Sequence, residues 1–142
     1  MKLAFFVPGV PQPKGSVTRI STGQYLEAGT GRSRKRKALW YARVAVDALR
    51  ASKGPLKPIS TGVTVAVCFK FPIPASRLRG RRKLTPGDPH LGPGDLDKLC
   101  RAVGDSLTRS GVIVDDRLIT TWYATKVYAT QGDEGANIAI TW

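Results

Sequence analysis

The sequence is poor in cysteine and histidine, and it has no long apolar run. Its 142 residues include two cysteines, Cys68 and Cys100, and one histidine, His90. These side chains cannot complete a zinc site made from cysteine and histidine, so any bound metal must have oxygen ligands. No segment approaches the roughly 20 apolar residues of a membrane span, and the first residues lack the longer apolar core of a signal peptide. We expect a soluble, reduced, cytoplasmic protein with no membrane partner.

Acidic residues are also scarce. Lysine and arginine number 23 against 10 aspartates and glutamates, which gives a formal net charge of +13. Such an imbalance says little about the fold but indicates a polyanionic partner, with nucleic acid as the leading candidate. Apolar residues make up 42% of the chain, enough to fill one core, so the length fits a single domain covering residues 1–142.

The first half of the chain predicts two strands and one helix. Residues 3–7 alternate as a strand does, and residues 21–37 are expected to form a surface loop or hairpin that leads into a helix over about 33–52. The helix is predicted from apolar residues at spacings of three and four, namely Leu39, Ala42, Val46 and Leu49. Residues 63–71 read as a central strand covered on both faces.

The second half predicts a helix over about 96–108, a short strand at 112–114 and a hairpin. The hairpin is expected to join residues 119–130 and 136–142 through the turn-like sequence "QGDEG". The order of elements indicates a small mixed α/β (α+β) domain, in which a mixed sheet is flanked by two main helices.

Residues 72–94 hold five prolines and the basic run "RLRGRRK", so we expect this segment to project from the domain and to touch DNA. The candidate DNA-binding residues are Lys14, Arg19, Arg79, Arg81, Arg82 and Lys83.

Half of the acidic residues fall in one window, "GDLDKLCRAVGDSLTRSGVIVDD", which spans residues 94–116. Leu99, Val103 and Leu107 repeat every four residues and predict the packing face of a helix. Asp97, Arg101 and Asp105 lie on a second stripe of that helix, while Asp95 precedes it and the pair Asp115 and Asp116 follows it. The three regions converge only if the 112–114 strand returns beside the start of the helix.

These aspartates also have structural interpretations. Asp95 or Asp97 could cap the helix, Asp105 could pair with a neighbouring arginine, and Asp115 and Asp116 could open a turn. If they converge instead, two carboxylates about 4 Å apart repel by about 4 kcal/mol at an effective dielectric near 20. That arrangement needs a cation, which could be an arginine of the protein or a bound Mg²⁺, the metal suited to phosphodiester chemistry.

The window resembles the signature of the RusA family of Holliday junction resolvases, in which D-x-D-N-x-x-K-x-x-x-D-x-L leads to a D-D pair. The start "PGVPQPKG" is similar to the P-x-P-K-G sequence of many members. The resemblance implies that Asp95, Asp97 and Asp116 bind the metal and that Asp105 is the helix aspartate, with Asp115 beside the third ligand.

Two positions depart from that pattern. The asparagine after the second aspartate is Lys98, and the helix lysine is Arg101. An arginine can steady a phosphate but is a poor proton donor, so the catalytic set implied is Asp95, Asp97, Asp116 and Arg101, with Lys98 as a substitute ammonium.

The resemblance implies a homodimeric, Mg²⁺-dependent endonuclease, with Mn²⁺ as a possible substitute, that nicks branched DNA, especially four-way junctions, symmetrically and leaves 5′-phosphates. Without the resemblance, the residues themselves predict only a metal-dependent nuclease that acts on nucleic acid. A restriction-like nuclease is disfavoured because no acidic residue is followed two positions later by lysine in the required D…(E/D)xK pattern. A non-catalytic nucleic-acid-binding module, or a junction binder that has lost cleavage, remains the alternative.

Overall fold

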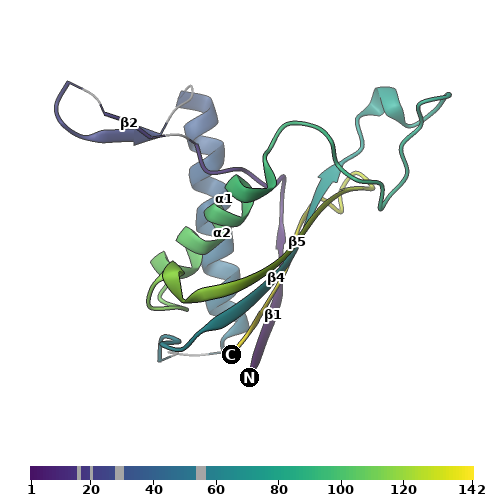
Figure 1. The fold of residues 1–142 in the computed structure, drawn as a ribbon. Helices are drawn as coiled ribbons and strands as arrows, with labels where there is room; N and C mark the ends of the chain where they lie inside the picture. Colours follow the sequence, from purple (N-terminus) through teal and green to yellow (C-terminus); the bar gives the residue numbers. More distant parts are fainter. Residues whose placement is uncertain (16, 20, 28–30, 54–56) are drawn as a thin grey trace.

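The computed structural model describes residues 1–15, 17–19, 21–27, 31–53 and 57–142, and only the backbone of residues 17–19 and 25–27. A four-stranded mixed sheet carries two main helices in one domain (Figure 1). The predicted α+β class is therefore confirmed. None of the helices in these described ranges is long and apolar enough to cross a membrane.

The sheet is built around β4 (Val63–Pro72). On one side β6 (Gly135–Thr141) pairs with β4 in antiparallel orientation, and β1 (Lys2–Pro8) pairs with the far edge of β6. On the other side β5 (Ile119–Ala129) runs parallel to β4 and forms the opposite edge. The central position predicted for this apolar strand is confirmed.

The predicted hairpin of the two last strands is wrong, because β4 lies between β5 and β6. The turn sequence reverses the chain, but it carries the chain across the end of β4 instead of joining neighbouring strands. A parallel pair needs a long crossover, and here the crossover from β4 to β5 contains the second main helix. The predicted strand at 112–114 is reduced to one parallel bridge between Ile113 and Ile59.

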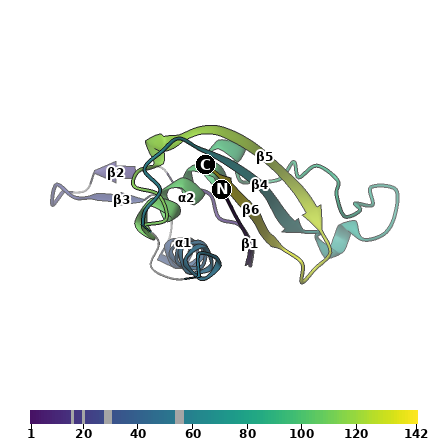
Figure 2. The ribbon, with the colours of Figure 1, turned by 90° about the horizontal axis from the view of Figure 1, so that it is seen from below.

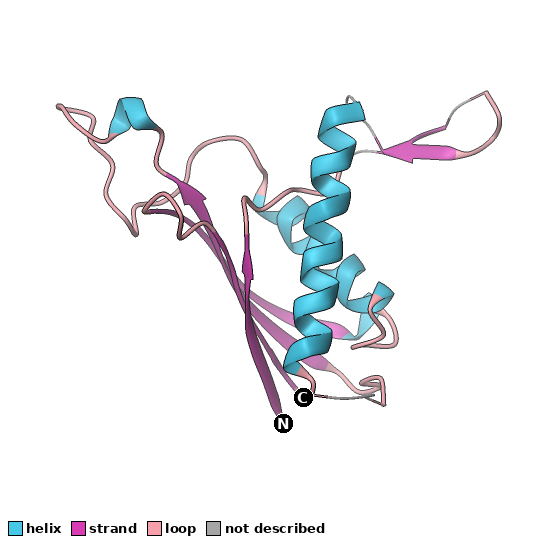
Figure 3. Cartoon of the chain, turned by 180° about the vertical axis from the view of Figure 1, so that it is seen from behind, coloured by secondary structure: helices cyan, strands magenta, loops and turns pink. Residues whose placement is uncertain are grey.

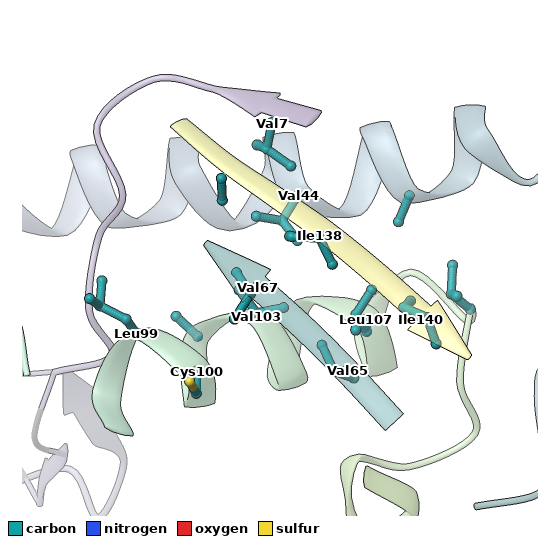
Figure 4. Close-up of a cluster of buried hydrophobic side chains, with 14 of the residues drawn as sticks. Val7, Val44, Val65, Val67, Leu99, Cys100, Val103, Leu107, Ile138 and Ile140 are labelled. Carbon is teal, nitrogen blue, oxygen red and sulfur yellow. The ribbon is translucent and has the colours of Figure 1, made fainter. Parts of the chain in front are cut away.

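Both main helices, α1 (Gly31–Ala51) and α2 (Leu96–Arg109), pack on the same face of the sheet (Figure 2). Val65 and Val67 of β4 face them and join a buried cluster with Val103 and Leu107 of α2 (Figure 4). The alternate side chains of β4 are only half-buried. The prediction that this strand is covered on both faces is therefore wrong, since the two helices pack against each other over one face.

Helix α1 is confirmed, but a different side of it packs against the sheet. The residues that predicted the helix include Leu39, Val46 and Leu49, and all three are exposed, Leu39 by 62%. The buried side consists of Trp40, Tyr41, Val44 and Ala48. The helix has apolar residues on two sides, and the side with the large aromatic rings enters the core.

Two segments project from the same end of the molecule (Figure 3). One is the hairpin of β2 (Val17–Arg19) and β3 (Tyr25–Glu27), which confirms the loop or hairpin expected before α1. The other is the loop after β4, which contains the short 3₁₀ helix η1 (Ala75–Arg77). Only the first part of that loop projects, because residues 87–90 return to the edge of β5.

Candidate active site

Helix α2 presents a buried side and a charged side, as its sequence predicts. Leu99, Val103 and Leu107 are fully buried against the sheet. Asp97 and Arg101, one turn apart, are exposed and line a pocket between α2 and β5. The local spacing alone determines this division, because both stripes lie within one helix.

The pocket has a volume of about 690 Å³. Its charged residues are Asp97, Arg101 and Asp116, and β5 contributes an apolar wall that includes Trp122 and Ala124. Asp116 begins the 3₁₀ helix η2 (Asp116–Leu118), which connects α2 to β5. Two of the three aspartates predicted to bind metal therefore face one pocket together with the predicted arginine.

Asp116 approaches α2 at Gly104, where there is room for a methyl group and little more on that side. A Cβ atom at position 104 would lie 3.6 Å from Cβ of Asp116 and 3.4 Å from Cδ1 of Ile119. The returning chain thus packs near the middle of α2, not beside its start as the sequence analysis required. Two turns of helix, a rise of about 10 Å, separate Asp97 from Gly104, and Arg101 lies between them. The sequence analysis missed Gly104, although a glycine kept inside a helical pattern often has a packing reason.

The five aspartates of the window differ in their partners. Three have a cation within salt-bridge distance: Asp95 Oδ2 lies 3.5 Å from Lys98 Nζ, Asp105 Oδ2 lies 3.0 Å from Lys14 Nζ, and Asp115 Oδ1 lies 3.8 Å from Arg117 Nε. Within the described part of the chain, neither Asp97 nor Asp116 has a salt bridge or a side-chain hydrogen bond. The two carboxylates of the pocket are those left without a protein partner.

Asp95 occupies the N-cap position of α2, but its side chain makes no capping hydrogen bond. Its carboxylate is exposed and lies beside Lys98, and it is not part of the pocket wall. Among the residues that the structure describes, no three Asp, Glu, His or Cys side chains form a group that could hold a metal ion. Asp95 thus lies at the start of α2, whereas Asp97 and Asp116 line the pocket on one side of it, and the three carboxylates do not meet at one point.

Two of the structural interpretations can be compared with this geometry. Asp105 pairs with Lys14, not with a neighbouring arginine of α2. Asp115 caps η2 by accepting a hydrogen bond from Arg117 N at 2.9 Å, so it opens a turn while Asp116 remains free to face the pocket.

Cys100 lies in the pocket wall one turn after Asp97. Burial, and then the nearby Asp97 carboxylate, raise the pKa of the Cys100 thiol to about 11. The thiol is therefore protonated at neutral pH and acts as a small apolar wall residue.

The predicted DNA-binding residues lie in different environments. Arg79, Arg81, Arg82 and Lys83 are exposed in the projecting loop, where Arg77 Nε donates to Arg82 O at 2.6 Å and holds the loop together. Lys14 instead has a largely buried side chain that pairs with Asp105 and lies 5.3 Å from the Tyr41 ring centroid. The side chain of Arg19 is outside the described residues.

The donor set fits Mg²⁺. This ion prefers oxygen ligands, keeps several waters, and is commonly bound by one or two carboxylates together with substrate phosphates. Asp97 and Asp116 supply two carboxylates that no described side chain pairs with, and Asp95 lies at the adjoining helix start.

Comparison with known proteins gives a family. Residues 8–141 match the family model described as Endodeoxyribonuclease RusA. No curated protein matches the chain. The match covers nearly the whole chain and includes the acidic window, so the chain belongs to the RusA endodeoxyribonuclease family, and membership implies a metal-dependent Holliday junction resolvase activity.

Proposed function

We propose that the protein is a Mg²⁺-dependent, structure-selective endodeoxyribonuclease that resolves four-way DNA junctions by paired symmetric nicks during recombination and repair. The observation that carries this proposal is the shared pocket of Asp97, Arg101 and Asp116, in which neither carboxylate has a partner among the described residues. A protein of charge +13 has many cations that could neutralise them. In a protein that only bound DNA, two carboxylates without a neutralising cation would weaken binding, because they repel phosphates.

In this proposal Asp97 and Asp116 would hold the metal as the two carboxylates of the pocket. Asp95, outside the pocket wall at the start of α2, is the third carboxylate that the family resemblance implies. When bound, Mg²⁺ supplies Lewis-acid polarisation of a phosphodiester and activation of water at neutral pH. Mn²⁺ has the same preference for carboxylate and water ligands, so it is expected to substitute.

Arg101 has the role of a phosphate clamp. Its guanidinium lies on the same pocket wall as Asp97, and it can donate two parallel hydrogen bonds to phosphate oxygens. Because it stays protonated, it can stabilise the charge that develops on the phosphate but does not transfer a proton. Lys98, whose Nζ lies 3.5 Å from Asp95 Oδ2, is the substitute ammonium beside that carboxylate.

The basic loop after β4 is proposed to bind the arms of the junction. Arg79, Arg81 and Arg82 are exposed, and the loop projects from the end of the sheet where α2 begins (Figure 1). A homodimer would present two pockets to a substrate that is itself twofold symmetric, one for each nicked strand.

Substitution of one pocket carboxylate tests the proposal. We expect Asp97→Asn to abolish Mg²⁺-dependent cleavage of a synthetic four-way junction, while junction binding stays intact or becomes tighter because one repelling charge is lost. Asp133→Asn, in the exposed turn after β5, removes the same charge far from the pocket and is the control. Undiminished cutting by Asp97→Asn would remove this residue from the site.

The substrate class needs a second comparison. A fixed junction, a mobile junction, a fork and plain duplex should be incubated in parallel, with and without Mg²⁺. Selective cutting of the junctions supports a resolvase, and equal cutting of all four indicates a general nuclease. Tight junction binding with no cutting in any metal would favour the alternative, a junction binder without catalytic activity.

A further inference from the structure

We propose that Lys126 is a positioning residue that fixes the chain immediately before Asp95. The inference rests on the proposed function, because it assigns Lys126 to the metal-binding carboxylates. Lys126 lies on β5 opposite Phe69 of β4. It was not among the residues selected from the sequence, where it is one of 23 basic side chains.

The half-buried ammonium of Lys126 binds two backbone carbonyls of one short segment. Its Nζ donates to Gly94 O at 2.8 Å and lies 3.4 Å from Gly92 O. Gly94 is directly followed by Asp95, so the shorter bond holds the peptide group that joins Gly94 to Asp95. An ammonium has three donors and no acceptor, which suits a point where two carbonyl oxygens converge.

The backbone of β5 at Lys126 and Tyr128 also binds the chain that leads to Gly92 and Gly94. His90 N donates to Lys126 O at 3.0 Å, Gly87 N donates to Tyr128 O at 2.9 Å, and Tyr128 N donates to Asp88 O at 2.8 Å. Residues 87–90 thus extend the sheet along the free edge of β5. Lys126 contributes its carbonyl at the start of the connection to α2 and its ammonium at the end.

His90 fixes the middle of this connection. Its ring is buried and stacks on Phe71 with a centroid distance of 3.9 Å, and Tyr128 packs edge-on at 4.8 Å. A Cβ at Gly92 would lie 3.0 Å from His90 Nε2, so the absence of a side chain allows the chain to pass close to the ring and to reach Lys126.

Gly94 then turns the chain into the helix. Its φ of +109° is a conformation that residues with a side chain rarely adopt. The next residue, Asp95, is the N-cap of α2, and its carbonyl accepts the hydrogen bond of Leu99 N at 3.0 Å. A carbonyl held by Lys126 therefore determines where the helix starts, and with it where Asp95 and Asp97 lie relative to β5 and Asp116.

The test compares Lys126→Met with wild type. Methionine keeps much of the apolar stem but removes the donor and the charge. We expect the Mg²⁺ concentration for half-maximal cleavage to rise roughly 10- to 100-fold, the usual effect of losing a residue that orients metal ligands. Cleavage at saturating Mg²⁺ should largely recover. Mn²⁺ binding without DNA, measured by electron paramagnetic resonance, should weaken by a similar factor, and amide exchange of residues 92–97 should become faster.

Two further variants control for charge and folding. Lys70→Met removes a lysine from the neighbouring strand β4, on the other face of the sheet, and should leave the Mg²⁺ requirement unchanged. Lys126→Arg keeps a cationic donor and should restore most of the metal affinity. If Lys126→Met does not fold, Gly94→Ala perturbs the same peptide group from the other side and should raise the Mg²⁺ requirement in the same way.

The outcomes separate this inference from the proposed function. If wild type cuts and binds Mn²⁺ but Lys126→Met has the same metal affinity and the same exchange rates, the positioning role is refuted. A lower rate at saturating Mg²⁺ with an unchanged metal requirement would also refute it and make Lys126 a residue that acts on the DNA. If wild type neither binds Mn²⁺ nor cuts, the proposed function itself fails.

Discussion

Replacing Gly104 by alanine and by leucine should change the stability of the domain in opposite directions. A methyl group at position 104 would make ordinary contacts, 3.4 Å from Ile119 Cδ1 and 3.6 Å from Asp116 Cβ. Glycine inside a helix costs about 0.5 to 1 kcal/mol relative to alanine. Gly104→Ala should therefore raise the free energy of unfolding by up to about 1 kcal/mol, which corresponds to a Tm increase of about 3 to 5 °C at this chain length.

A leucine at the same position would project into the pocket that Gly104 helps to line. Its Cβ would already contact Ile119, Asp116 and Trp122, whose Cζ2 lies 3.8 Å from the Cβ position, so its further carbons would crowd these side chains and fill part of the pocket. Overpacking of this kind typically costs about 1 to 3 kcal/mol, so Gly104→Leu should lower Tm by several degrees. Because it moves Asp116 away from α2, it should also raise the Mg²⁺ concentration needed for cleavage.

Thermal unfolding followed by circular dichroism and a Mg²⁺ titration of junction cleavage measure both effects. Ala42→Leu, which places the same side chain on the exposed side of α1, controls for the larger side chain. If Gly104→Leu were as stable as Gly104→Ala and needed no more Mg²⁺, the packing of Asp116 against α2 would be refuted, and with it the pocket that supports the proposed function.

Three other predictions concern the loop, an ion pair and the histidine. Neutralising Arg79, Arg81 and Arg82 with glutamine should weaken junction binding and flatten its dependence on log salt by up to about 0.9 per lost phosphate contact; an unchanged slope in a filter-binding titration would show that the loop does not touch DNA. Lys14→Met removes the partner of Asp105, and because the side chains of Lys14 and Asp105 are only 15% and 28% exposed, we expect it to lower the free energy of unfolding by about 1 to 3 kcal/mol. The double variant with Asp105→Leu should regain most of this loss. Weaker DNA binding at unchanged stability would instead support the predicted contact of Lys14 with DNA. Burial, and then the Lys126 ammonium, lower the pKa of His90 below its usual 6.5. As the pH drops below about 6.5, His90 is therefore protonated in the unfolded chain before it is protonated in the folded one, and stability falls. His90→Phe should remove this part of the pH dependence of Tm, and an equal fall of Tm in wild type and variant would refute the prediction.

Local patterns were sufficient for the elements that depend only on neighbouring residues. The spacing of Leu99, Val103 and Leu107 determines the buried side of α2, and the same spacing places Asp97 and Arg101 on the other side. The strand over 63–71 is mostly apolar, with Thr64 and Lys70 as its polar residues, and this composition predicts a central strand.

Contacts between distant segments could not be predicted in this way. The turn "QGDEG" predicts a chain reversal but cannot show that β4 lies between the two strands that it joins. Helix α1 has two apolar sides, and periodicity alone cannot choose between Leu39 and Trp40. The contact of Gly104 with Asp116, and the bond from Lys126 to Gly94, join residues 12 and 32 positions apart through geometry that only the folded chain defines.

The pairing of charges within residues 94–116 determines whether the pocket attracts or repels a DNA phosphate. Lys98, Lys14 and Arg117 neutralise three aspartates, and the pocket keeps two carboxylates and one guanidinium, which leaves one net negative charge. Alone, such a pocket repels a phosphodiester although the rest of the protein attracts it. One divalent cation changes the balance to one net positive charge, which complements a phosphate. On the proposed function, the metal therefore has to be in the pocket for the scissile phosphate to bind there, and removing the Asp97 charge should favour DNA binding while it prevents cleavage.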